Sequence, residues 1–200
     1  DFLDYLVDTH ENNQSCGITT GKIYDYADRT DVWYSGGSLS NWTFEVNYCH
    51  DDSQTKEKVT DIPGCLMLIS SDVLNEVGLL NEDYFMYSED SEFCYRVNQS
   101  GFNMIVDRRS VIYHKNSNSS RRTSAPPSLR VYYSVRNRIL MIRQHMDRRK
   151  IIFSTIYHIC WYSLLILFWS YKQWWHQVYA IIHGAADGIL GTAGKCEKYH

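Results

Sequence analysis

The fold assignment starts from the stretch Asn81-Glu82-Asp83-Tyr84-Phe85-Met86-Tyr87-Ser88-Glu89-Asp90-Ser91-Glu92-Phe93-Cys94-Tyr95-Arg96. It begins with aromatic residues and continues into adjacent carboxylates at the start of a predicted helix. Ser88 is a suitable N-cap, which puts Glu89 and Asp90 in the first turn. Free backbone N–H groups and the helix dipole favour anions there. Gly101 is a natural stop for this helix.

The predicted helix has one apolar face. Phe93, Cys94 and Val97 form its stripe, and Asp90 lies on the same face, three and four residues before the first two. Glu89 is rotated by about 100° from Asp90, so the two carboxylates point in different directions. Asp90 is therefore predicted to project from the buried face at the open end of the helix. The alternative is an acidic first turn that only complements the helix dipole.

The length and the cysteines set outer limits. Two hundred residues suffice for one domain with a core, or for part of a larger one. The chain begins Asp1-Phe2-Leu3-Asp4, with neither an initiator Met nor a signal-like segment, so we expect a fragment that begins in mid-protein. The six cysteines are scattered without C-x-x-C spacing. This favours reduced thiols in a cytosolic setting over a zinc site or a disulfide framework.

The charge is distributed unevenly along the chain. The first hundred residues carry 5 Lys or Arg against 19 Asp or Glu, and the second hundred carry 15 against 4, within a net charge of −3. A basic half beside apolar segments favours an anionic partner such as anionic lipid or a phosphate-bearing ligand. The chain has no recognised nucleic-acid-binding motif, so nucleic acid is not an expected partner.

Hydrophobic patterning predicts an α/β chain. The expected helices are 1–14, 71–77, 88–100, 129–146 and 177–194, the last interrupted by glycines. The expected strands are 16–24, 31–37, 63–69, 103–106 and 110–114. The run 63–69 is apolar enough for a fully buried strand. Residues 38–58 show no clear period and are predicted to form a long surface loop.

An ordered series of motifs surrounds the opening stretch. It consists of Ile62-Pro63-Gly64-Cys65-Leu66-Met67-Leu68-Ile69, then 77–82, 84–96, Gly101, Val111-Ile112-Tyr113-His114 and Tyr133-Ser134-Val135-Arg136-Asn137-Arg138. This succession resembles family-2 glycosyltransferases, above all the rhamnosyltransferase-type and related bacterial cell-surface enzymes. The resemblance implies an α/β fold with an incomplete GT-A-type mixed sheet and flanking helices. Residues 1–128 would be the acceptor-side part, and residues 129–200 a C-terminal helical, membrane-associated region.

The resemblance also implies roles at the opening stretch. It assigns Asp90 as the general base, which takes the proton from an acceptor hydroxyl as that oxygen attacks the anomeric carbon. Glu89 is expected to hydrogen-bond the acceptor or to hold the loop. Tyr87, together with Tyr84 and Phe85, is expected to offer stacking faces to a sugar.

Metal and phosphate contacts are implied farther along the chain. The resemblance makes His114 a ligand for Mg²⁺ or Mn²⁺ that bridges the donor diphosphate, and the alternative is a strand-end histidine bonded to backbone. Arg121 and Arg122 are expected to clamp phosphate, or simply to form a solvated loop. Gly64 is expected to allow a close backbone approach near the acceptor, or only to begin a strand. The chain has no Asp-x-Asp at a strand end, so we expect it to be inactive alone.

Residues 151–169 are expected to associate with a membrane. These 19 residues contain no Asp, Glu, Lys or Arg and are about long enough to cross a hydrocarbon core of roughly 30 Å. Arg148-Arg149-Lys150 precedes the run, and Trp and Tyr residues flank its end. The preceding basic helix suits an anionic leaflet. The pattern leaves open whether the segment spans the membrane or lies on it, and a core helix is the alternative.

The sequence thus predicts an inverting glycosyltransferase of cell-surface polysaccharide synthesis at the cytoplasmic face of the cell membrane. It would transfer a sugar from a nucleotide-sugar donor to a glycan or lipid-linked glycan acceptor, with the donor half absent from this chain. The alternative is a non-catalytic membrane-associated module that binds glycan or anionic lipid.

Overall fold

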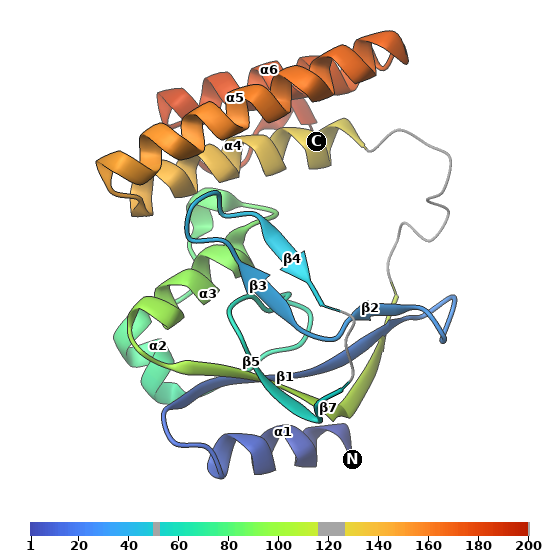
Figure 1. The fold of residues 1–200 in the computed structure, drawn as a ribbon, viewed down its shortest axis with the longest axis vertical. Helices are drawn as coiled ribbons and strands as arrows, with labels where there is room; N and C mark the ends of the chain where they lie inside the picture. Colours follow the sequence, from blue (N-terminus) through green and yellow to red (C-terminus); the bar gives the residue numbers. More distant parts are fainter. Residues whose placement is uncertain (50–52, 116–126, 200) are drawn as a thin grey trace. The chain divides into compact units, whose positions relative to one another are not determined.

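The computed structural model describes residues 1–49, 53–115 and 127–199 (Figure 1). They form two compact units. Unit 1 comprises Asp1–Leu39, Val46–Leu80 and Asp90–Arg121, and unit 2 comprises Ser40–Glu45, Asn81–Glu89 and Arg122–His200. The predicted division into domains 1–128 and 129–200 stays a prediction. Two segments from the first half of the chain, Ser40–Glu45 and Asn81–Glu89, belong to the same unit as the C-terminal helices.

Unit 1 contains a five-stranded mixed sheet with the order β2-β1-β7-β5, in which β6 also pairs with β1. The strands are β1 (Cys16–Asp25), β2 (Val32–Tyr34), β5 (Lys56–Val59), β6 (Leu68–Ile69) and β7 (Asn103–His114). β1 and β7 run parallel, and the other pairs are antiparallel. A separate antiparallel ribbon joins β3 (Gly37–Leu39) to β4 (Val46–Tyr48).

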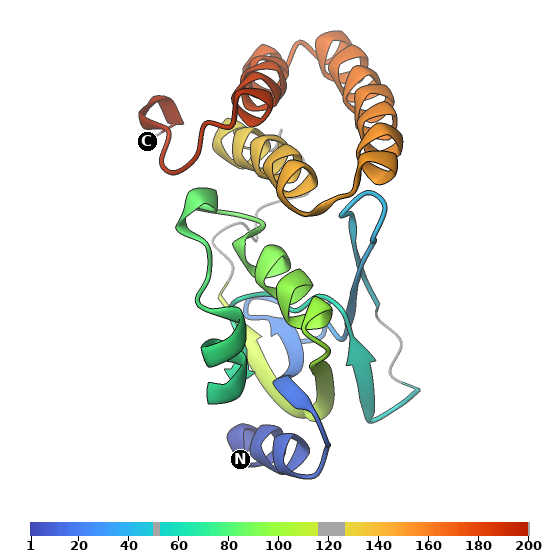
Figure 2. The same cartoon turned by 90° about the vertical axis from the view of Figure 1, so that its left-hand side faces the viewer.

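Helices cover both faces of this sheet. α1 (Phe2–Glu11) lies on one face, and α2 (Ser71–Val77) and α3 (Glu89–Gln99) lie on the other (Figure 2). Side chains alternate along β7 accordingly. Met104 and Val106 join the core under α2 and α3. Asp107 points to the α1 side, where its carboxylate accepts a hydrogen bond from the Thr9 hydroxyl at 2.6 Å.

Several predicted elements are confirmed, namely the first helix, strand β1 and helix α2. α2 begins after Ser70, whose side chain accepts a hydrogen bond from the Val73 N–H, and it ends at Gly78 with φ 83°. These are the N-cap and C-cap residues that helix ends favour.

The predicted loop 38–58 is wrong, because it contains most of β3, all of β4 and most of β5. These strands have only three or four residues, too few for a period to show in sequence. The predicted buried strand 63–69 is also too long. Only Leu68–Ile69 pairs with β1, and both residues are half-buried.

β7 is one continuous strand, so the prediction of two strands around a turn is wrong. Its register against β1 shifts between Gly21 and Lys22, whose partners are Asp107 and Val111. The extra residues form a bulge at the predicted turn. A Cβ on Gly21 would lie 2.4 Å from the carbonyl oxygen of Ser110, so the bulge requires glycine there.

Unit 2 is built on α4 (Ser128–His145), α5 (Arg148–Tyr171) and α6 (Trp175–Leu190), with short 3-10 turns at Glu82–Tyr84 and Glu197–Tyr199. α6 is continuous, so the predicted glycine breaks are wrong. Gly184 and Gly188 instead let α6 approach α4. A Cβ on Gly184 would lie 2.6 Å from the carbonyl oxygen of Tyr132, and one on Gly188 would lie 2.8 Å from the Cβ of Ile139.

α5 is the one helix of the described residues that is long and apolar enough to cross a membrane. It has 24 residues, and its most apolar window has a mean hydropathy of 1.8, with 11% of that window buried. Its buried residues, Ser154 and His158, are both polar. The sheet of unit 1 and the helices of both units confirm the predicted mixed α/β class. The GT-A type stays a prediction.

Candidate functional site

Asp90 is the second residue of α3, and backbone donors meet both of its carboxylate oxygens. Its Oδ2 accepts a hydrogen bond from the Gly64 N–H at 3.1 Å, and its Oδ1 accepts one from the Ser91 N–H at 2.8 Å. Asp90 remains half-exposed, so solvent can reach it.

The backbone of Gly64 lies next to this carboxylate, and the substrate-binding role of Gly64 stays a prediction. A Cβ at that position would lie 3.6 Å from the Cβ of Asp90, which is ordinary contact, so space alone does not require glycine. The prediction for Ser88 is less accurate. Its φ is 67°, in the left-handed region, whereas an N-cap residue is usually extended.

The charge of Asp90 reaches two side chains of unit 1 that the sequence did not indicate. Desolvation raises the pKa of the Cys65 thiol to about 11, and the Asp90 carboxylate contributes to the increase, although Cys65 as a whole is exposed. Burial also raises the pKa of Tyr48, with further contributions from Asp61 and Asp90. Both groups are therefore neutral near pH 7.

His114 ends β7 beside Asp25 of β1. Its ring stacks on Trp33, with the ring centroids 5.1 Å apart, and its carbonyl oxygen accepts a hydrogen bond from the Tyr26 N–H at 3.0 Å. Trp33 in turn meets Tyr48 edge-on at 6.4 Å. Trp33 thus contacts both His114 and Tyr48, the tyrosine whose pKa the charge of Asp90 helps to raise.

Sequence analysis missed these two aromatic residues as members of the site. Tyr48 lies in β4, which was assigned to a loop, so nothing in the sequence placed its ring beside Trp33. The metal-binding role of His114 stays a prediction. Arg121 and Arg122, the predicted phosphate clamp, lie outside the described residues.

The loop 81–89 leads directly into Asp90 and belongs to unit 2, where α4 anchors it. The Asn137 amide donates hydrogen bonds to the carbonyl oxygens of Tyr84 and Met86, both at 2.9 Å, and of Tyr87 at 2.6 Å. The Arg136 guanidinium donates to the Tyr84 carbonyl at 2.9 Å and to the Asn137 side-chain oxygen at 2.9 Å. Both α4 side chains are fully buried.

This anchor holds an unusual backbone. Phe85, Tyr87 and Ser88 have φ values of 59°, 65° and 67°, in the left-handed region that side chains with a Cβ seldom occupy. Residues in such conformations persist where surrounding contacts over-determine them. The amide of Asn137, which binds three successive parts of this loop, supplies such contacts.

The aromatic side chains of the loop have different environments. Tyr84 is fully buried and its hydroxyl donates to Gln144 at 2.7 Å, so the expectation that it stacks on a sugar is wrong. Phe85 is exposed. Tyr87 packs beside the α4–α6 cluster, with the Arg130 guanidinium 5.9 Å from its ring centre. The substrate-binding role of Tyr87 and the role of Glu89 stay predictions.

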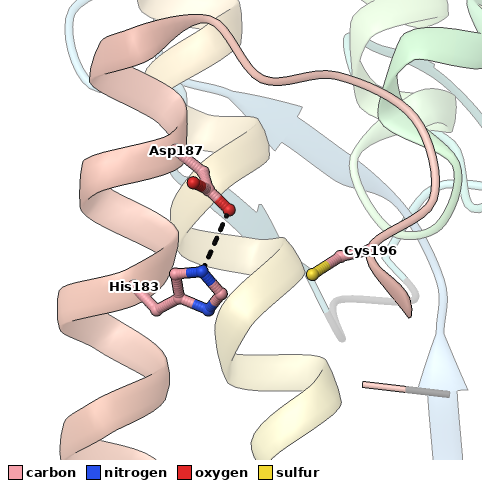
Figure 3. A group of neighbouring side chains, drawn as sticks. All are labelled: His183, Asp187 and Cys196. Atoms are coloured by element: carbon pink, nitrogen blue, oxygen red, sulfur yellow. Dashed lines mark ion pairs between the residues drawn. The ribbon is translucent and has the colours of Figure 1, made fainter. Parts of the chain in front are cut away.

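Among the described residues, one group of three side chains could hold a metal ion, and His114 is not part of it. The group consists of His183, Asp187 and Cys196 in unit 2 (Figure 3). Glu89, Asp90 and His114, which were predicted to act in catalysis or donor binding, are therefore not members of this group.

Comparison with known proteins gives one informative similarity. No protein-family model matches the chain. The low-salt glycan biosynthesis hexosyltransferase Agl10 of Haloferax volcanii is 30% identical over 139 residues, which cover 68% of this chain and 44% of that protein. The chain thus spans less than half the length of this relative. The similarity supports a relationship with glycosyltransferases.

Proposed function

We propose that this chain is the acceptor-side part of an inverting glycosyltransferase of glycan biosynthesis, with Asp90 as its general base. The observation that carries the proposal is the setting of Asp90, a half-exposed carboxylate at a helix start with a backbone donor on each oxygen. The similarity to a hexosyltransferase of low-salt glycan biosynthesis supports the reaction class. The GT-A fold, the nucleotide-sugar donor and a glycan or lipid-linked acceptor belong to the same proposal.

In this reaction Asp90 needs only to be ionised and to lie next to the acceptor hydroxyl. An acceptor hydroxyl would give its proton to the carboxylate while its oxygen attacks the anomeric carbon, and the nucleoside diphosphate would leave from the opposite side. A base must lie within hydrogen-bond reach of the proton it takes. The Gly64 N–H holds one oxygen of this carboxylate, and the Ser91 N–H holds the other.

The loop 81–89 precedes this base in the chain and is held within unit 2. Arg136 and Asn137 of α4 donate hydrogen bonds to its backbone as far as Tyr87. These two side chains therefore keep the backbone of the loop in its unusual conformation.

Mg²⁺ or Mn²⁺ is expected at the donor diphosphate of the intact enzyme. Hard divalent cations prefer sets of oxygen ligands, and a single imidazole does not hold them. Among the residues that the structure describes, the one group of side chains that could hold a metal ion is His183, Asp187 and Cys196, and His114 is not part of it. No step proposed for Asp90 therefore runs through a metal.

The proposal includes a membrane surface for α5. Most of its exposed side chains are apolar, while its buried ones, Ser154 and His158, are polar. Exposed apolar residues along the helix include Ile152, Ile156, Ile159, Leu164, Leu167 and Phe168. This distribution is the reverse of a helix in water and suits contact with lipid.

Contacts inside unit 2 favour α5 lying on the membrane over spanning it. The His158 Nε2 is 3.5 Å from the Oε1 of Glu45, a residue of the loop Ser40–Glu45. His158 is ten residues into the helix, about 15 Å from its start at 1.5 Å per residue. In a spanning helix that depth is the middle of a core of roughly 30 Å, where a carboxylate on a polar loop is costly.

The test of catalysis is an Asp90→Asn variant of the enzyme that carries these residues together with a donor-binding half. We expect transfer from the nucleotide sugar to fall by about 10²–10⁴-fold, with donor binding unchanged, because the amide cannot accept the proton. Release of nucleoside diphosphate measures turnover. Asp72→Asn is the matched control, since Asp72 is an exposed acid in the first turn of α2.

Turnover near the unsubstituted level in Asp90→Asn would contradict the assignment of Asp90 as the base.

A second candidate, a non-catalytic module that binds glycan or anionic lipid, is favoured by the apolar surface of α5. It predicts liposome binding without any transfer by the complete protein. Transfer that depends on Asp90 would eliminate that candidate.

A further inference from the structure

We propose that His183, Asp187 and Cys196 form a binding site for a zinc-type divalent cation. One ligand atom from each residue lies within 4.8 Å of the others. His183 and Asp187 are four residues apart on α6, so their side chains share one face of the helix. Cys196 faces them from the segment after α6 (Figure 3).

The donor set matches zinc chemistry. Zinc takes thiolate sulfur at about 2.3 Å, imidazole nitrogen at about 2.0–2.1 Å and carboxylate oxygen at about 2.0–2.2 Å. Two ligands of one ion must therefore lie less than roughly 4.4 Å apart, and in a tetrahedral site near 3.5 Å. A spread of at most 4.8 Å needs only about 1 Å of side-chain closure. Three protein ligands also leave one position open.

The charges of the site would balance. A thiolate and a carboxylate together neutralise a divalent cation, and the imidazole adds a neutral ligand. His183 has one ring nitrogen beside Asp187, with Nε2 3.4 Å from Oδ2. Its Nδ1 is buried and has no hydrogen-bond partner among the residues that the structure describes. We assign Nε2, the nitrogen beside Asp187, as the ligand atom of His183.

Neighbouring groups orient the ligands, as in established metal sites. The Tyr132 hydroxyl donates a hydrogen bond to the Oδ2 of Asp187 at 2.6 Å. The Tyr132 ring stacks on Tyr199 at 4.4 Å, and the His183 ring lies 5.2 Å from that of Tyr132. The Cys196 N–H donates to the Tyr133 hydroxyl at 2.8 Å, which fixes the backbone that carries the thiol.

A bound ion would tie the segment after α6 to the helix itself. That segment also meets the loop 81–89, since the Gly194 N–H donates to the Asp83 carbonyl at 2.7 Å. The Gly194 carbonyl oxygen in turn accepts a hydrogen bond from Arg136, which also holds the loop. The ion would thus stabilise the surroundings of this loop without touching Asp90. The inference stands independently of the proposed transferase activity.

The test measures Zn²⁺ and Co²⁺ binding to the detergent-solubilised 200-residue chain purified with reductant and freed of metal by chelator. We expect one equivalent of Zn²⁺, a higher melting temperature with Zn²⁺, and a near-ultraviolet thiolate-to-Co²⁺ absorption band. Because the thiol must lose its proton, affinity should fall as pH falls. The band reports sulfur ligation directly and does not depend on enzymatic activity.

Substitutions identify the site. Cys196→Ser should abolish the Co²⁺ band, and His183→Ala should weaken Zn²⁺ binding at least tenfold. Tyr132→Phe removes the donor to Asp187 and should weaken Zn²⁺ binding about tenfold. Cys160→Ser, an exposed cysteine on α5, is the matched control and should change nothing. Circular dichroism confirms that each variant remains folded.

An unsubstituted chain that takes up no stoichiometric Zn²⁺ at micromolar concentration would overturn the proposal. So would a folded Cys196→Ser variant that keeps the Co²⁺ band. In either case His183 and Asp187 are an ion pair beside an unrelated thiol. Loss of transfer in Asp90→Asn has no bearing on these outcomes, so the two proposals fail separately.

Discussion

Helices α3 and α5 differ in whether they bury apolar side chains. α3 places Phe93, Cys94 and Val97 in the core with no exposed surface, and it also buries Ser91 and Glu92. α5 buries the polar Ser154 and His158 and exposes residues such as Ile159 at 61% and Leu167 at 68%. A helix whose outer face meets water buries its apolar side chains. α3 follows that rule, and the exposed apolar side chains of α5 support the membrane surface that we propose for it.

The two helices also differ in where their polar side chains lie. On α3, Asp90 lies at the helix start, where backbone N–H groups of Gly64 and Ser91 meet it and solvent still reaches it. On α5, His158 lies in mid-helix, and its polar contacts to Ser154 and Glu45 are on the protein side. The first arrangement leaves a carboxylate available for chemistry. The second keeps polar groups away from the exposed apolar face.

The largest effect should come from equal truncations on the two helices. Phe93→Ala should lower the free energy of unfolding by about 3–5 kcal/mol, since it empties a fully packed position. Phe168→Ala, at 52% exposure on α5, should change it by about 0.5 kcal/mol or less. Urea titration in detergent measures both. Equal losses would mean that α5 is packed as a core helix and would break the comparison.

An intermediate effect is expected at the exposed apolar face of α5. Ile159→Lys should weaken binding to vesicles containing anionic lipid by about 1–3 kcal/mol, roughly five- to hundredfold, because a charged group resists transfer into hydrocarbon. Vesicle co-sedimentation gives the partition coefficient. Gln99→Lys, on the water-facing end of α3, is the control. If the two lysines had the same effect, the exposed face of α5 would not be the membrane surface.

The smallest effect concerns the polar side of α5. A hydrogen bond with His158, with help from Arg138, holds the pKa of Glu45 below its usual 4.5 despite desolvation. Its contribution to stability is therefore present above pH 4.5 and is lost as pH falls below it. Glu45 is 37% exposed, so screening limits the contribution to about 1 kcal/mol or less.

Melting temperatures of the unsubstituted chain and Glu45→Gln measure this contribution. The variant should melt lower at pH 7, and the difference should shrink as pH falls below 4.5. Glu82→Gln, an exposed acid of the loop 81–89, serves as the control. A difference that does not vary between pH 7 and pH 3 would show that Glu45 does not act through its charge.

Patterns within one segment were predicted well. The period of Phe93, Cys94 and Val97 placed α3 and the side on which Asp90 lies, and all three residues are buried. The composition of 151–169 predicted a long apolar helix, which is α5. The predicted helix 71–77, stopped at Gly78, is α2 with the same bounds. In each case the physical cause, a helical period or a cap, acts within a few residues.

Pairings between distant segments were not predicted. β3 and β4 exist because Gly37, Ser38 and Leu39 align with Tyr48, Asn47 and Val46, and neither segment has a period of its own. For the same reason Tyr48 was missed beside Trp33. Cys196 looked isolated in sequence, and only the fold of the chain after α6 brings it to His183 and Asp187.

The sequence by itself determined the helices, the position of Asp90 at a helix start, the apolar character of α5 and the order of motifs that resembles glycosyltransferases. Local propensity and burial period are encoded in neighbouring residues, so they survive without the fold. The tertiary structure decided which donors meet Asp90, that Arg136 and Asn137 hold the loop before it, and that a histidine, an acid and a thiol converge. Those contacts depend on long-range pairing, which no single segment specifies.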